Sequence, residues 1–206
     1  MSAPPAQLYV ISAPSGAGKT SLVRALLERR PNLTVSVSHT TRKPRPHERD
    51  GEHYHFVEPG HFDALAGGGA FLEHARVFDN CYGTGREQVL EKLRSGHDVL
   101  LEIDWQGAQQ VRRAMPACRS IFILPPSRAA LEQRLRERAT DSAATIARRL
   151  RDAAQDMSHC REFDYAVVND RFEQAVLELG RILDGDGAGL SAHRPELDPL
   201  LAQLTA

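Results

Sequence analysis

The sequence predicts an α/β fold in which a parallel sheet is flanked by helices and interrupted by an inserted subdomain. Three short runs, at 8–12, 99–103 and 120–124, are mainly apolar, which is typical of strands buried on both faces of a parallel sheet. A segment with helical spacing follows each run, and alternation of strand and helix gives a parallel sheet. The stretch from about 38 to 85 is rich in strands and breaks this alternation, so we interpret it as an insertion.

The first half of the chain is expected to contain short strands and short helices. Leucine and valine side chains recur at helical spacing before Pro31, which predicts a helix over 21–30. The polar, proline-bearing segment 39–52 is expected to be a loop. By the same criteria, strands are predicted at 33–38, 54–57 and 70–78, and helices at 62–65 and 86–93.

The second half continues with longer helices. Helices are predicted at 109–114, 128–138 and 172–183, with a further helix carrying Ile146, Leu150 and Met157 on one face and a last strand at 165–168. The tail is rich in glycine from Gly185, and leucines then recur with the spacing i, i+3, i+4, i+7 from Leu197. This spacing favours a helix that docks on the domain over a frayed end.

Composition excludes several classes of protein. With 26 Lys and Arg against 27 Asp and Glu, the net charge is −1, which argues against binding nucleic acid through bulk positive charge. No apolar run approaches the roughly 18 residues of a membrane-spanning helix, and the N-terminus does not resemble a secretory signal. The three cysteines are odd in number and widely spaced, which fits a reducing cytoplasm.

A glycine-rich loop between the first strand and the first helix is the strongest sign of chemistry. The loop consists of Ala13, Pro14, Ser15, Gly16, Ala17, Gly18, Lys19 and Thr20. It matches the Walker A pattern G-x-x-x-x-G-K-[ST] except that Ala13 replaces the first glycine. The glycines allow backbone N–H groups to surround phosphate oxygens at a helix N-terminus. Lys19 could reach the β- and γ-phosphates of a nucleotide, and the Thr20 hydroxyl could bind Mg²⁺.

Further motifs follow in a fixed order along the chain. They read SHTTRKPR at 38–45, GEHYHF at 51–56, FLEHA at 71–75, YGT at 82–84, LLEIDWQGA at 100–108, RLRER at 134–138 and VVND at 167–170. In this combination the chain resembles the guanylate kinase family, close to its bacterial members, over about residues 8–183. The resemblance implies a P-loop kinase core, a nucleoside-monophosphate-binding insert and a mobile lid.

The expected domain boundaries follow from that resemblance. The P-loop kinase core would comprise 1–37 and 86–184, with the lid at about 134–150. The GMP-binding subdomain would comprise 38–85, and the C-terminal tail 185–206.

The inserted stretch carries groups suited to a phosphate. Arg42 and Arg45 lie on a loop bracketed by prolines, where two guanidinium groups could clamp a phosphate bidentately. Tyr54 and Tyr82 could add hydroxyl donors without adding charge. The resemblance implies that these four residues hold the phosphate of GMP.

Recognition of the base needs other groups. A carboxylate accepts hydrogen bonds from N1–H and N2–H₂ of guanine together, whereas it would face a lone pair at N1 of adenine. The resemblance assigns Glu73 and Ser38 to reading guanine, and it also assigns Thr84 and Asp104 to base contacts. Glu102 or Asp104, at the end of a buried strand, could instead support Mg²⁺ through water, and the sequence leaves this open.

The donor side is assigned in the same way. Between 128 and 151 there are seven arginines against three acids, so charge alone is equally consistent with a solvated basic face. The resemblance makes Arg134, Arg138 and Arg149 lid arginines that close on the donor phosphates. Asn169 falls where the family contacts adenine.

The expected reaction is ATP + GMP → ADP + GDP by in-line transfer, with Mg²⁺ as cofactor and without a covalent intermediate. ATP and GMP would be the partners, with no nucleic acid and no membrane, and a homo-oligomer stays open. Two alternatives remain: a non-catalytic module that binds proteins, and a related kinase acting on another phosphorylated acceptor such as a ribose bisphosphate.

Overall fold

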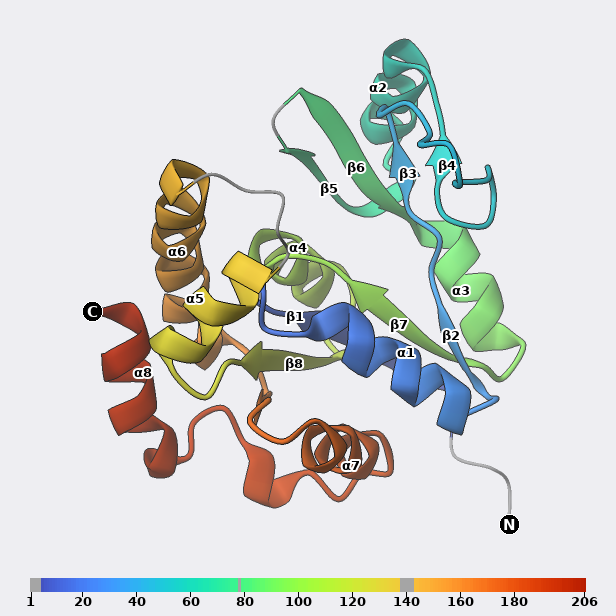
Figure 1. Ribbon diagram of the computed structural model, residues 1–206. Coiled ribbons are helices and arrows are strands. Elements are labelled where there is room, and N and C mark those ends of the chain that lie inside the picture. The colour runs from blue at the N-terminus through green and yellow to red at the C-terminus, as the bar shows by residue number, and fades with distance from the viewer. Residues whose placement is uncertain (1–4, 78, 138–142) are drawn as a thin grey trace. The chain divides into compact units, whose positions relative to one another are not determined.

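The computed structural model describes residues 5–77, 79–137 and 143–206 (Figure 1). The chain divides into two compact units. One unit consists of the residues up to Val10 together with Asn32–Cys118, and the other of Ile11–Pro31 together with Arg119–Ala206. In the described part of the chain, no helix is both long and apolar enough to span a bilayer.

A five-stranded sheet has the order β2-β7-β1-β8-β9. Its strands are β1 (Leu8–Ser12), β2 (Leu33–Val35), β7 (Asp98–Glu102), β8 (Arg119–Leu124) and β9 (Tyr165–Val168). The pairs β2–β7 and β8–β9 are parallel. The chain order reverses at β1, and in open α/β sheets ligands bind beyond the carboxyl end of the strand at such a reversal.

The first unit also contains a small mixed sheet with the order β4-β3-β6-β5. These strands are β3 (His39–Thr40), β4 (His55–Phe56), β5 (Phe71–Val77) and β6 (Asn80–Gly85), and β5 and β6 form an antiparallel pair. The helices of this unit are α2 (Pro59–Gly67), α3 (Arg86–Arg94) and α4 (Trp105–Ala114). Figure 1 shows α2 beside the small sheet, where Phe62 packs on Phe71 with ring centroids 4.8 Å apart.

The second unit is mainly helical around β8 and β9. Its helices are α1 (Lys19–Arg29), α5 (Arg128–Glu137), α6 (Ala143–Ser158), α7 (Phe172–Leu183) and α8 (Asp198–Thr205). The side chains of β8 from Ile121 to Leu124 are completely buried, as expected for a strand covered on both faces. Helix α8 packs against α6 (Figure 1). Leu197 and Leu204 of the tail are buried, so the docked tail helix is confirmed.

Most elements lie where the sequence predicts them, and the strands at 8–12 and 165–168 and the helix at 172–183 have the predicted bounds. The strand predicted at 33–38 ends at Val35, and β3 lies in the segment expected to be a loop. Helix α2 begins at Pro59, because proline suits the first turn of a helix. Helix α4 begins at Trp105, because the Asp104 side chain caps it by accepting a hydrogen bond from Gly107 N at 2.7 Å.

Strand β6 was not predicted. Its sequence, NCYGTG, has two glycines and no apolar alternation, so the strand forms because β5 and β3 pair with it on either side. Glycine suits position 83, since a Cβ atom there would lie 3.1 Å from the Phe71 ring and 3.2 Å from the Cβ atom of His74 and would crowd both. This strand is therefore determined by its tertiary contacts and not by its own sequence pattern.

Candidate active site

The glycine-rich loop turns from the end of β1 into α1. Gly16 and Gly18 have φ angles of +91° and +93°, which side chains rarely tolerate, so glycine is needed at both positions. Gly18 is the N-cap of α1, and no side chain caps the helix. The N–H groups in the first turn of a helix, together with the helix dipole, favour binding of an anion at this end of α1. Thr20 is exposed on the first turn.

Asn169, at the end of β9, holds this loop in place. Its Nδ2 atom donates a hydrogen bond of 2.8 Å to the carbonyl oxygen of Ala17, and its side chain is buried. A Cβ atom on Gly18 would lie only 2.4 Å from the same Nδ2 atom. The residue expected at the adenine thus lies against the phosphate loop.

Arg134, on α5, approaches the same place. Its Nη2 atom donates to the carbonyl oxygen of Asn169 at 2.9 Å. Its Nη1 atom is buried and has no hydrogen-bond partner within the described residues. A buried guanidinium with an unused donor is costly unless a ligand completes it. Arg138 lies outside the described residues, and Arg149 lies on α6.

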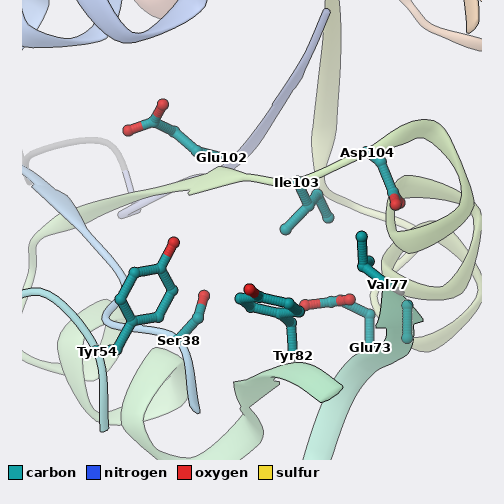
Figure 2. A pocket seen from close by; sticks show the side chains of 9 residues that line it. Ser38, Tyr54, Glu73, Val77, Tyr82, Glu102, Ile103 and Asp104 are labelled. Atoms are coloured by element: carbon teal, nitrogen blue, oxygen red, sulfur yellow. The ribbon is translucent and has the colours of Figure 1, made fainter. Parts of the chain in front are cut away.

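A cavity of about 280 Å³ lies in the first unit, at the lower limit of the volumes usual for small-molecule sites. It is lined by Ser38, Tyr54, Glu73, Ala75, Val77, Tyr82, Glu102, Ile103 and Asp104. Figure 2 shows the hydroxyl groups of Ser38 and Tyr54, the Tyr82 ring and the Glu73 carboxylate around it, with Glu102, Ile103 and Asp104 on the segment that ends β7. Five of the predicted acceptor-binding residues therefore meet at one cavity.

Glu73 is the most perturbed acid of this cavity. Its side chain is 5% exposed, and the Thr84 hydroxyl donates to its Oε1 atom at 2.6 Å. Burial, and then the negative charge of Asp104, raise its pKa to about 7, although the hydrogen bonds from Thr84 act in the opposite direction. Thr84 lies behind the carboxylate and does not line the cavity.

The two arginines expected at the acceptor phosphate have different environments. The Nη atoms of Arg42 donate to both carboxylate oxygens of Glu48, at 2.8 and 2.9 Å. The Arg42 guanidinium carbon lies 5.4 Å from the centroid of the Tyr54 ring, next to the cavity. Arg45 is exposed, and its guanidinium has no hydrogen bond or ion pair with the described residues.

Sequence reasoning missed the apolar lining of the cavity. Ala75 and Val77 lie on the same face of β5 as Glu73, so the two-residue period of a strand could have identified them. Ile103 lies between Glu102 and Asp104 and also lines the cavity, although nothing in the sequence indicated it as a site residue. Glu102 lines the cavity too, although the sequence suggested only a role in supporting Mg²⁺. Glu48 gave no signal, because on a charged loop a single acid cannot be told from a solvated one.

The fold and these sites define a class of protein. A phosphate loop following the central strand of a parallel sheet, together with an acidic cavity on a small accessory sheet, is typical of P-loop kinases of small phosphorylated substrates. The family model for guanylate kinase matches residues 5–186. The chain therefore belongs to the guanylate kinase family.

Curated relatives agree with this assignment over nearly the whole chain. The guanylate kinase of Methylococcus capsulatus is 57% identical over 197 residues, which cover 96% of this chain and 97% of that protein. The guanylate kinase of Escherichia coli K12 is 51% identical over 201 residues, or 97% of each chain. The crystal structure of guanylate kinase from Anaplasma phagocytophilum matches with a TM-score of 0.70 and 34% identity, covering 98% of this chain and 96% of that one.

Proposed function

We propose that the chain transfers the γ-phosphate of ATP to GMP, forming ADP and GDP. The observation that carries this proposal is the buried Glu73 carboxylate in a cavity that Ser38 also lines. A guanine offers N1–H and N2–H₂ to the carboxylate, and its O6 accepts from a hydroxyl. Adenine would leave the carboxylate facing a lone pair, and an unpaired buried group discriminates strongly.

The acceptor phosphate is proposed to bind on the side of Tyr54 and Tyr82. Their hydroxyl groups would donate to it, and Arg42 and Arg45 would supply the positive charge. Thr84 would orient the Glu73 carboxylate. Asp104, which caps α4 with Oδ1, would contact the base. A proposed GMP-binding subdomain of 38–85 contains all of these residues except Asp104.

The donor phosphates are proposed to bind the loop from Ala13 to Thr20. Lys19 and the unused Nη1 donor of Arg134 would stabilise charge on the transferred group, with Arg138 and Arg149 as further lid arginines. Asn169 is proposed to serve the ATP side through its hold on the loop at Ala17. Transfer then depends on positioning and charge neutralisation, and no side chain needs to act as a covalent nucleophile.

Mg²⁺ is proposed as the cofactor, and the loop suits it. The Thr20 hydroxyl is exposed at the start of α1, and the first turn carries no acid. Mg²⁺ prefers oxygen ligands and usually keeps several waters while binding nucleotide phosphates, so one hydroxyl from the protein suffices. When bound, the ion would neutralise charge on the β- and γ-phosphates. The free thiols of Cys81, Cys118 and Cys160 support a cytoplasmic location.

The test of this proposal is Lys19→Ala in a coupled assay of ADP release. We expect kcat to fall by about 100-fold or more, as when other stabilising groups of a transition state are removed, while the KM for GMP changes little. The matched control is Arg24→Ala, which removes an exposed cation from the same helix and should leave turnover unchanged. Near-normal turnover of Lys19→Ala would contradict the proposal.

A further inference from the structure

The ion pair of Arg42 and Glu48 is unusually well enclosed for a surface loop. The two side chains are 17% and 14% exposed, whereas most other ion pairs of the described residues involve side chains that are about half exposed or more. The pairing is bidentate, with Nη1 to Oε2 at 2.9 Å and Nη2 to Oε1 at 2.8 Å. This geometry fixes the plane of the guanidinium as well as its position.

Glu48 also organises the backbone around the second arginine. Its Oε2 atom accepts from the Arg45 backbone N–H at 2.8 Å, and its own N–H donates to the Arg45 carbonyl oxygen at 3.0 Å. These hydrogen bonds, with the one from Arg42 Nη1 to the Lys43 carbonyl oxygen, close the segment 42–48 into a hydrogen-bonded ring. The hydrogen bonds that its carboxylate accepts, from the Arg42 side chain first and then from the Arg45 backbone N–H, lower the pKa of Glu48 to about 2, so the carboxylate is ionised at neutral pH.

We propose that Glu48 positions both arginines for the acceptor phosphate. It would bind the Nη1 and Nη2 atoms of Arg42 and so leave the remaining N–H donors of the guanidinium for the phosphate. It would also fix the backbone from which the Arg45 side chain extends. This inference rests on the proposed function, and it adds a residue that acts through Arg42 and Arg45 without touching the substrate.

The hydrogen bonds of Arg42 leave part of its guanidinium group available for a ligand. A guanidinium has five N–H groups, and Glu48 and the Lys43 carbonyl oxygen receive three hydrogen bonds from Nη1 and Nη2. The hydrogen bonds with Glu48, and further one with Tyr82, raise the pKa of Arg42. Tyr54 and Tyr82 both line the cavity, and the guanidinium carbon lies 5.4 Å from the Tyr54 ring centroid, so the Arg42 guanidinium lies beside the cavity with donors that Glu48 and Lys43 do not use.

A phosphate that displaced Glu48 from Arg42 would bind less favourably than one that binds beside the intact ion pair. The carboxylate would lose its cation while a phosphate with a charge near −2 lay beside it, and like charges at close range are strongly unfavourable. The Tyr54 and Phe56 rings, 5.4 and 5.8 Å from the guanidinium carbon, also limit where Arg42 can move. The phosphate is therefore added to the ion pair, and Glu48 is not its competitor.

The test is Glu48→Gln, which keeps the shape and the oxygen that accepts from Arg45 N–H but removes the charge. GMP affinity is measured by calorimetry without ATP, and KM and kcat by ADP release. We expect GMP affinity to fall about tenfold or more, because a charge-assisted bidentate pair is lost, while the KM for ATP stays unchanged. The matched control, Glu52→Gln, removes a mostly exposed acid four residues further on and should change neither value.

A double-mutant cycle with Arg42→Lys separates positioning from a general loss of structure. If Glu48 acts through Arg42, then Glu48→Gln costs much less affinity in the Arg42→Lys background than in the wild type. Equal costs in both backgrounds, an unchanged affinity, or a tighter binding of GMP would overturn the proposal. If the wild type binds GMP and Glu48→Gln binds it equally, only this proposal fails; if the wild type does not bind GMP, the proposed function fails first.

Discussion

The Glu73 carboxyl lies between a hydroxyl that favours its charged form and a second acid that opposes it. Thr84 donates to Oε1, while Asp104 lies close enough to raise the pKa of Glu73. A Cβ atom on Gly107 would come within 3.0 Å of Oε2, so even the backbone of α4 closes around this group. An acid buried in this way pairs readily with a donor, and guanine supplies two.

This environment predicts that GMP binding depends on pH. Burial raises the pKa of Glu73 from 4.5 to about 7, so below about pH 7 the carboxyl holds a proton that guanine binding must remove. GMP affinity should therefore fall as the pH decreases, by about fivefold from pH 7 to pH 6 when this group alone is counted. The measurement is calorimetric titration with GMP between pH 6 and pH 8.

The control for this prediction is Glu73→Gln, because the phosphate of GMP also takes up a proton near pH 6. The variant should bind GMP weakly, and its affinity should vary with pH only through protonation of the phosphate of GMP. A wild-type profile identical in slope to that of Glu73→Gln would show that the Glu73 carboxyl does not titrate on binding.

Among the elements, the turn from β1 into α1 depends most on a few backbone angles. Gly18 combines a positive φ with contact to Asn169, so both the backbone and a neighbour exclude a side chain there. Gly18→Ala should lower the free energy of unfolding by about 1–3 kcal/mol and abolish tight ATP binding. Urea denaturation and ATP titration measure the two effects.

The matched control is Gly60→Ala in α2. A Cβ atom there meets no atom within 4 Å, and the residue does not have a positive φ. This change should alter stability by less than about 1 kcal/mol, in the stabilising direction. If both variants behaved alike, the strained loop would not be the reason for glycine at position 18.

The C-terminal helix contributes to the second unit through buried leucines. Leu204 is completely buried where α8 packs on α6, so Leu204→Ala should cost about 2 kcal/mol or more. Leu177→Ala, at a position that is 58% exposed on α7, should change stability by less than about 0.5 kcal/mol. Equal midpoints of urea denaturation for the two variants would mean that α8 does not hold to the unit in solution.

How far the sequence predicts an element depends on where its determinants lie. Strand β1 and helix α7 carry their own apolar patterns, so their bounds follow from the sequence. Strand β6 depends on its partners, and no local pattern predicts it. At the site, motif residues such as Glu73 could be identified, but its burial arises from contacts between separate segments. The pairing of Glu48 with Arg42 is local, but it depends on the conformation of an irregular loop that no sequence pattern specifies.

For the whole molecule, the net charge close to zero gives no information on how the arginine side chains are distributed. Of the 26 basic residues, 23 are arginine, and many form ion pairs such as Arg29–Glu173 and Arg30–Asp184. Largely exposed pairs of this kind contribute little to stability, so much of the arginine content has little influence on the fold. One unit carries the acidic cavity and the other the phosphate loop, as a kinase with two phosphorylated substrates requires.

The most direct test of this account is ADP release by the wild-type protein with ATP, Mg²⁺ and a panel of acceptors. We predict rapid turnover with GMP and, because the Glu73 carboxylate would face a lone pair of adenine, turnover with AMP lower by about 1,000-fold or more. A ribose bisphosphate should give none. The account would be contradicted if none of the acceptors in the panel gave ADP release, or if acceptors that lack guanine were turned over as fast as GMP.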